Sequence, residues 1–126
     1  MPNVILTPHI AGSTEEAQYA IGLEVAESFR RYFKIGSSPG AVNFPNVDLP
    51  VRHGTSRILN VHRNEPGVLG EINGLISQAG ANIEGQYLTT DTMIGYLVVD
   101  VDAAHAKNLA DEVAKLPRSL KTRLVF

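Results

Sequence analysis

The sequence predicts an α+β protein, in which a four-stranded antiparallel sheet carries two helices on one face and is preceded by a separate strand and one long helix. Residues 56–126 alternate between strand-like and helix-like patterns in the order β-α-β-β-α-β. Residues 1–35 hold one short apolar strand and then a single long amphipathic pattern. Between them, residues 36–55 are rich in Gly, Pro and Ser without either period, which indicates a linker.

Residues 56–126 form a complete unit with the order of a ferredoxin-like fold. Strands are expected at residues 57–62, 82–90, 94–101 and 120–126, with Asp91-Thr92 as a hairpin turn. The first helix is expected to begin at Pro66, which suits the first helical position, and to end at Gly80, and the second ends at Pro117. Their apolar stripes are Leu69, Ile72, Leu75, Ile76 and Ala79, and Ala106, Leu109, Val113 and Leu116. We expect Leu59 and Val61 to share one face, with Ile58, Asn60 and His62 on the face that the helices leave open.

Residues 1–35 lack a partner within the chain. The run Asn3–Leu6 is apolar on both faces, which predicts a strand from the middle of a parallel sheet. Ser13 and Glu16 form a capping box, so a helix is expected to begin there and to end before Gly36. Its apolar stripe is Ala17, Ile21, Val25, Phe29 and Phe33. We infer a remnant of an α/β domain, and we expect another copy of the chain to cover the stripe.

Composition excludes several classes of function. Apolar residues are 44% and charged residues 19% of the chain, which is typical of a soluble globular protein. The net charge of -2 gives no reason to expect nucleic acid or an anionic membrane as a partner. No apolar run approaches the ~20 residues of a membrane span, and no signal segment is recognisable, so a cytoplasmic location is expected. Without Cys or histidines at metal-ligand spacing, no metal site is expected.

The segment from Asn60 to Leu69 is the candidate binding site. A loop between a strand end and a helix start offers free N–H groups and the positive end of a helix dipole, which suit a carboxylate. His62 and Asn64 lie at that opening. Asn82 begins the second strand and is remote from the opening within one chain, although not across a two-fold axis. Alternatively, Asn64 is a polar residue beside a helix and Asn82 a turn residue, with no ligand.

Several motifs carry a resemblance to a known family. Residues 57–126 resemble an ACT domain, a small-molecule-sensing module of amino-acid enzymes. The run His62-x-Asn64-x-Pro66-Gly67-Val68-Leu69, with Ala81-Asn82-Ile83 and Gln86-Tyr87-Leu88, is similar to the version in the D-3-phosphoglycerate dehydrogenase family of D-2-hydroxyacid dehydrogenases. The run from Thr7 to Gln18 resembles that family's stretch with the catalytic histidine, with Ala11-Gly12 where two glycines are common. Ala41-Val42-Asn43-Phe44-Pro45 resembles its linker.

The resemblance implies a serine-sensing role in feedback inhibition of serine biosynthesis. His62 and Asn64 of one subunit and Asn82 of another would hold L-serine at the seam of a homodimer or larger homo-oligomer. His9 would be the acid/base of the reaction only in the full-length parent, which uses NAD. This chain has no Gly-x-Gly-x-x-Gly after a strand, so we expect it to hold no cofactor and to be inactive alone.

Two other functions remain open from the sequence. One is an ACT dimerisation module whose ligand site is silent. The other is an RNA-binding β-α-β-β-α-β domain, which needs stacked aromatic residues on the open sheet face and a basic surface. Residues 51–126 have eight basic and eight acidic side chains, and the expected open face carries Asn60 and His62 instead of aromatic residues. Both observations disfavour RNA.

Overall fold

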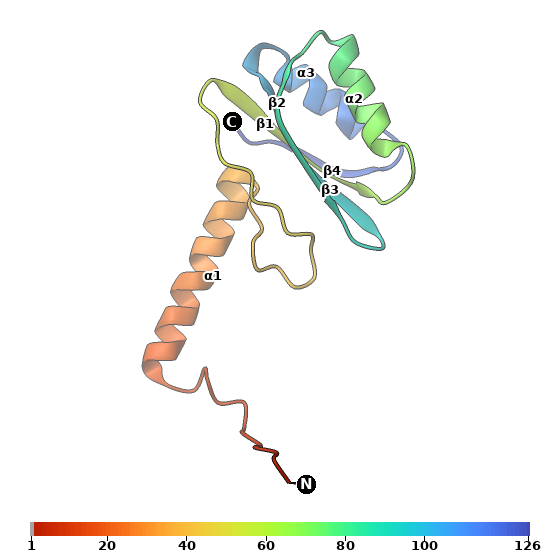
Figure 1. The fold of residues 1–126 in the computed structure, drawn as a ribbon. Coiled ribbons are helices and arrows are strands. Elements are labelled where there is room, and N and C mark those ends of the chain that lie inside the picture. Colours follow the sequence, from red (N-terminus) through yellow and green to blue (C-terminus); the bar gives the residue numbers. More distant parts are fainter. Residues whose placement is uncertain (1) are drawn as a thin grey trace.

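A computed structural model describes residues 2–126 and confirms the α+β fold with its β-α-β-β-α-β order (Figure 1). The elements in chain order are α1 (Glu15–Ile35), β1 (Thr55–Arg63), α2 (Val68–Gln78), β2 (Ile83–Thr90), β3 (Ile94–Asp102), α3 (Ala103–Ala114) and β4 (Ser119–Leu124). The strands form one sheet in the order β2-β3-β1-β4, and each neighbouring pair is antiparallel. The central strands are therefore β1 and β3.

Helices α2 and α3 lie together on one face of the sheet, as the sequence predicts (Figure 1). Their predicted apolar stripes pack onto residues of β1 and β3 and form the main core. The buried members of this core are Ile58, Val68, Ile72, Ile76, Leu97, Val99, Val101, Ala106, Leu109, Ala110 and Val113. Burying each large apolar side chain contributes roughly 1.5–3 kcal/mol, so this layer holds the sheet and the two helices together.

The expected orientation of β1 is wrong. Ile58 is 1% exposed and belongs to the core under the helices, so Asn60 and His62, at alternate positions, face the helices too. Leu59 lies on the opposite face, where it packs with Val47 of the linker. The pattern could not decide the side, because both faces of this central strand are covered and both carry apolar residues.

The linker between α1 and β1 has no helix or strand, as predicted, but it is packed against the sheet. Val47 is buried with Tyr96 and Val98 of β3. The Ser38 hydroxyl donates to the Pro45 carbonyl (2.8 Å) and accepts from the Val47 N–H (2.9 Å). The face that we expected to be open is therefore covered by the chain's own linker.

A buried ion pair joins β1, β3, α1 and the linker. Arg57 and Asp100 face each other across β1 and β3, and both side chains are fully buried. The guanidinium donates to both carboxylate oxygens, at 2.6 and 2.7 Å. It also donates to the carbonyls of Ile35 (3.0 Å), Leu49 (2.8 Å) and Pro50 (2.8 Å). One side chain thus holds the last turn of α1 and the end of the linker on the sheet.

The end of α1 is fixed a second time by Tyr96. Its hydroxyl donates to the Gly36 carbonyl at 2.7 Å. Gly36 caps α1 in the left-handed conformation (φ 73°), which confirms the predicted helix end. A Cβ on Gly36 would collide with Leu59, so both the backbone angle and the close approach require glycine here.

The start of the chain differs from the prediction in two ways. Helix α1 begins one residue later than predicted, because Thr14 is its N-cap and accepts from the Ala17 N–H at 3.1 Å. The Ser13 hydroxyl instead donates to the Ile10 carbonyl (2.6 Å). No strand forms at Asn3–Leu6, since no strand of residues 2–126 pairs with it.

The apolar stripe of α1 is exposed in the single chain. The helix projects away from the sheet and contacts it only at its C-terminal end (Figure 1), where Arg123 donates to the Tyr32 carbonyl (3.1 Å). Phe29 and Phe33 are 60% and 61% exposed. Cover by another copy stays a prediction. Among residues 2–126, no helix combines the length and apolar character needed to cross a membrane.

The buried ion pair yields a stability prediction. Replacing Arg57 by Ala leaves Asp100 buried without its partner, so we expect the free energy of unfolding to fall by about 3–5 kcal/mol in urea titrations. Arg30→Ala, which breaks an exposed pair with Glu27, is the matched control and should cause no measurable change. Equal stability of the two variants would contradict the role given to Arg57.

Candidate functional site

His62 lies near the end of β1, on the face that the helices cover. It pairs across the sheet with Gly95 of β3, and the imidazole lies directly over that glycine. A Cβ at position 95 would overlap the ring, so the missing side chain creates the space that His62 occupies. His62 is only 3% exposed. Its ring is therefore packed against β3 and almost completely buried.

A neighbouring amide orients the His62 ring. Nδ1 of His62 lies 2.8 Å from Oδ1 of Asn60, which is itself buried on the same face. Burial lowers the pKa of His62 below its ordinary value of 6.5, because desolvation penalises the charged ring. His62 therefore presents a neutral imidazole at neutral pH.

Asn64 lies close to His62, beside the hairpin turn and the start of β3. Its backbone N–H donates to the Met93 carbonyl (2.9 Å), and its side-chain amide donates to the Asp91 carbonyl (2.6 Å). Asp91 is fixed in turn, because its carboxylate accepts from the N–H groups of Ile94 and Met93, and these hydrogen bonds lower its pKa. The fold thus brings two of the three predicted site residues together.

The start of α2 borders these two residues and offers unpaired backbone donors. Gly67 is its N-cap, with φ of 92°, and no side chain caps the helix, so α2 begins at Val68 and not at Pro66 as predicted. Arg118, from the loop after α3, donates to the Pro66 carbonyl (2.7 Å) and the Glu71 carboxylate (2.9 Å) and so holds the loop in place. The first N–H groups of α2 and its dipole favour a negative charge at this opening.

Asn82 lies at the opposite end of the sheet. Its N–H donates to Asp102 (3.0 Å) and its side chain to Glu84 (2.7 Å). Asp102 pairs with Thr55 at the start of β1, eight residues before Arg63. At roughly 3.3 Å per residue, about 26 Å of strand separate Asn82 from the His62–Asn64 end. Within one chain, the three residues do not meet around a small ligand.

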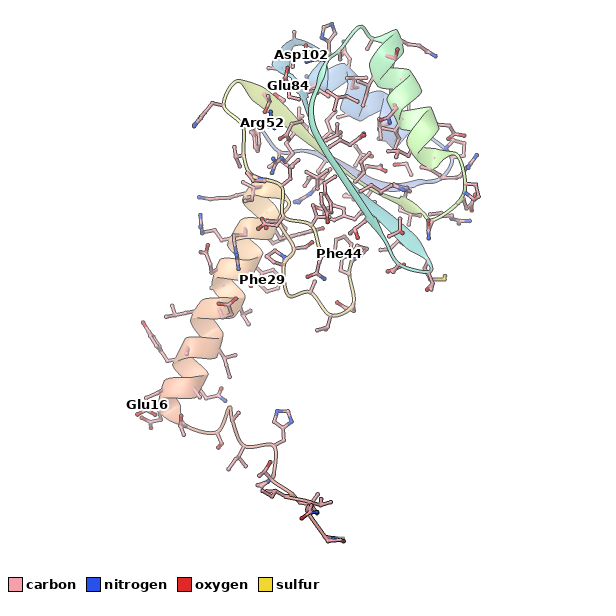
Figure 2. All side chains as sticks on the ribbon, viewed as in Figure 1. Glu16, Phe29, Phe44, Arg52, Glu84 and Asp102 are labelled. Atoms are coloured by element: carbon pink, nitrogen blue, oxygen red, sulfur yellow. The ribbon has the colours of Figure 1, made fainter. Side chains whose placement is uncertain are left out.

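A polar hollow of about 520 Å³ lies next to Asn82. Arg52, Glu84 and Asp102 line it, and Figure 2 shows these three side chains at the same end of the sheet. Asp102 also forms a hydrogen bond with His105 of α3. This bond is the main cause of a lowered pKa of Asp102, and the bond from the Asn82 N–H is the second cause. Asn82 is therefore held by a network of charged residues that the sequence analysis did not identify.

His9 lies apart from all of these residues. It is exposed in a bend of the segment before α1, and that segment sits at the end of α1 far from the sheet (Figure 1). In the part of the chain that the structure describes, no three His, Asp or Glu side chains gather in a way that could hold a metal ion.

The sequence analysis placed Asn60 in the candidate segment and on the same face as His62, because the two are two residues apart on one strand, but it gave Asn60 no role. It missed Gly95 altogether. The cross-strand partner Gly95 follows from register, which needs the pairing of β1 with β3.

Comparisons with known proteins agree with this fold. The family model described as "AHAS small subunit-like ACT domain" matches residues 58–121. The crystal structure of the ACT domain from GTP pyrophosphokinase of Chlorobium tepidum aligns with a TM-score of 0.50 at 19% identity, over 56% of this chain and 95% of that one. This similarity supports the fold only.

Whole-chain relatives are D-3-phosphoglycerate dehydrogenases. That of Dictyostelium discoideum is 50% identical over 99% of this chain, and that of Haemophilus influenzae is 47% identical over 98%. That of Escherichia coli K12 is 44% identical over 98%. This chain spans about 30% of the length of each. The resemblance drawn from the motifs is confirmed.

Gly95 provides a test of the site's packing. Gly95→Ala places a methyl group where the His62 ring lies, so we expect unfolding free energy to fall by about 1–3 kcal/mol. Gly74→Ala is the control, because a Cβ there meets open space in the middle of α2 and should stabilise by about 0.5–1 kcal/mol. Opposite signs for the two variants in denaturant titrations are the expected result.

Burial of His62 also predicts a pH dependence. Because its pKa is lower in the folded than in the unfolded state, the unfolded chain binds the proton more tightly. The free energy of unfolding that depends on a neutral His62 is therefore fully present above about pH 6.5, and it is lost as the pH falls through the folded pKa. His62→Gln should flatten this part of the stability profile, measured by urea unfolding from pH 7.5 to 5. An unchanged profile would contradict the assignment.

Proposed function

The chain belongs to the family of ACT domains, and from this premise we propose that it senses L-serine on behalf of a D-3-phosphoglycerate dehydrogenase. The observation that carries the proposal is the gathering of His62 and Asn64 beside the uncapped start of α2. The relatives' name refers to 3-phosphoglycerate oxidation, and the motifs resemble the version of this domain that responds to serine. Residues 56–126 would be the sensor, with residues 36–55 as its linker to residues 1–35.

The chemistry of these groups suits a zwitterionic amino acid. L-Serine presents a carboxylate, an ammonium group and a hydroxyl. The free N–H groups and dipole of α2 favour the carboxylate. Neutral imidazole and amide groups can form hydrogen bonds with the ammonium and hydroxyl groups, and burying these neutral groups avoids the desolvation cost of another charge.

A homodimer would complete the site. Strand β2 is at the edge of the sheet and has no neighbour on its outer side within residues 2–126. If two copies pair antiparallel along β2 about a two-fold axis, the start of one β2 lies beside the end of the other. Asn82 is at the start and Asn64, bonded to Asp91, is at the end. In such a dimer, one ligand could contact Asn64 of one subunit and Asn82 of the other.

Inhibition requires that serine bind one arrangement of the enzyme better than another. The end of α1 is attached directly to the sheet through Arg57 and Tyr96. A shift between two sensor domains would therefore be passed to residues 1–35, and feedback inhibition of the whole enzyme is the proposed outcome.

The dehydrogenase reaction is proposed for the whole protein only. His9 would serve there as the acid/base, with NAD held by other parts of the enzyme. The residues of this chain do not fit NAD, since the segment around His9 is exposed and joins no parallel sheet among residues 2–126. We therefore expect this chain to be inactive alone.

A ligand-silent dimerisation module is the second candidate. It is favoured by one observation: the side-chain amides of Asn64 and Asn82 already donate within the chain, to Asp91 and Glu84. A calorimetric titration with L-serine separates the two functions, because a silent module releases no heat of binding.

The ligand site yields a test by substitution. If Asn82 donates to bound serine, Asn82→Ala should weaken binding by about 1–3 kcal/mol, roughly 5- to 150-fold. Asn108→Ala, at an exposed position on α3, is the matched control and should leave the affinity unchanged. Equal affinities of the two variants would remove Asn82 from the site.

Mixing two variants tests whether the site is shared. A heterodimer of one Asn82→Ala chain and one His62→Ala chain has one intact site and one doubly damaged site. It should bind about half of one serine per chain at full affinity. A purified heterodimer that binds no serine would show that the residues act within one chain or that the site lies elsewhere.

A further inference from the structure

We propose that Asn60 is a positioning residue that fixes the tautomer of His62, so that the site accepts a hydrogen-bond donor of the ligand at His62 Nε2. This inference rests on the proposed function in one respect, namely that His62 contacts the ligand. The assignment of the tautomer is independent of any ligand.

The evidence is a compact polar cluster beneath the helices. Asn60 Nδ2 lies 2.7 Å from the Ser119 hydroxyl and 2.9 Å from the Thr122 hydroxyl, both on β4. The two hydroxyl oxygens are themselves 3.1 Å apart. The other end of the amide, Oδ1, faces Nδ1 of His62. Asn60 is 1% exposed, so water cannot readily replace these partners.

Counting hydrogens decides which way the Asn60 amide points. If Oδ1 faced the two hydroxyls, three oxygen atoms would share only the two hydroxyl hydrogens, and one of the three contacts would have none. With Nδ2 in that position, its two hydrogens and one hydroxyl hydrogen fill all three contacts. The triangle formed with Ser119 and Thr122 therefore requires Nδ2, and Oδ1 must face His62.

The direction of the amide sets the state of the ring. Oδ1 can only accept, so Nδ1 of His62 must carry a hydrogen and donate it to Asn60. In a neutral imidazole, the other nitrogen is then a pure acceptor. No described residue hydrogen-bonds to Nε2. Within residues 2–126, Arg31 Nε is the only side-chain nitrogen or oxygen that is fully buried and has no partner. His62 Nε2 also has no partner but is not such an atom. It therefore keeps some access to solvent.

This arrangement predicts what the ligand must offer. An acceptor at Nε2 repels a carboxylate and binds an ammonium or hydroxyl group. The carboxylate is left to the start of α2, which provides donors. The two halves of the site are thus complementary to the two ends of an α-amino acid, and ligands that present only acceptor groups to His62 are rejected.

The test is ¹⁵N NMR of the imidazole rings in the full chain, with L-serine and without it. Without ligand, the Nδ1 signal of His62 should be that of a protonated nitrogen and Nε2 that of an unprotonated one. On adding L-serine, the Nε2 signal should shift as it accepts a hydrogen bond, while Nδ1 stays protonated. A protonated Nε2 in either state overturns the proposal.

Substitution tests the part played by Asn60. Asn60→Leu removes the acceptor for Nδ1, so both tautomers should appear and L-serine affinity should fall about tenfold. Asn73→Leu is the matched control, because it removes an amide on the same side of the sheet whose one side-chain hydrogen bond within residues 2–126 is accepted from Gln86. It should change neither tautomer nor affinity.

A second variant covers the case in which Asn60→Leu does not fold. Replacing both hydroxyls, as Ser119→Ala with Thr122→Val, keeps Asn60 but removes what orients its amide, so a mixture of His62 tautomers is expected. A single unchanged tautomer in that variant overturns the proposal.

The two proposals fail in distinguishable ways. If the wild-type chain binds no serine but shows protonated Nδ1 that Asn60 substitutions disturb, the positioning role holds and serine sensing fails. If serine binds with Nε2 protonated, sensing stands and the positioning role is overturned.

Discussion

The Arg57–Asp100 ion pair at the centre of the sheet is the interaction on which the rest of the structure depends. Two charges without exposure to water are stable only when nearly all their hydrogen-bonding capacity is used. The Asp100 carboxylate accepts a bidentate contact from the Arg57 guanidinium. The remaining guanidinium donors bond to three backbone carbonyls from α1 and the linker. The pair therefore fixes more than its own two strands, because its desolvation is offset only while α1 and the linker remain docked.

The two faces of strand β1 contact different parts of the molecule. The odd-numbered positions, Arg57 and Leu59, face the linker and hold the preceding segment. The even-numbered positions, Asn60 and His62, face the helices and form the candidate site. Because a strand is stiff across its short width, a displacement at one face is felt at the other. The proposed sensing would therefore require no long chain of side-chain contacts.

The sequence was sufficient for those features that depend on local periodicity. The helix stripes, the hairpin at Asp91 and the cap at Gly36 were predicted and are confirmed, because each follows from nearby residues. The proximity of His62 and Asn64 could also be predicted, since both adjoin one loop. Features that depend on pairing were not accessible in this way.

Two of the three errors share that cause. The face of Ile58 depends on which side the helices cover, and an alternation of apolar residues on both sides carries no such information. The apolar run at Asn3–Leu6 has strand propensity but no neighbour to provide hydrogen bonds. The third error is local: the Ser13 hydroxyl donates to the Ile10 carbonyl, and Thr14, the next residue, caps the helix instead.

Attachment of α1 at one end only makes it a lever. Its 21 residues span about 30 Å at 1.5 Å per residue, and the contacts that anchor it are confined to the last turn and Gly36. A rotation of about 5° at this fulcrum would sweep the first turn through roughly 2–3 Å, by the length of the helix alone. Movements too small to break any hydrogen bond in the sheet would thus be magnified where the helix begins, next to the segment that carries His9.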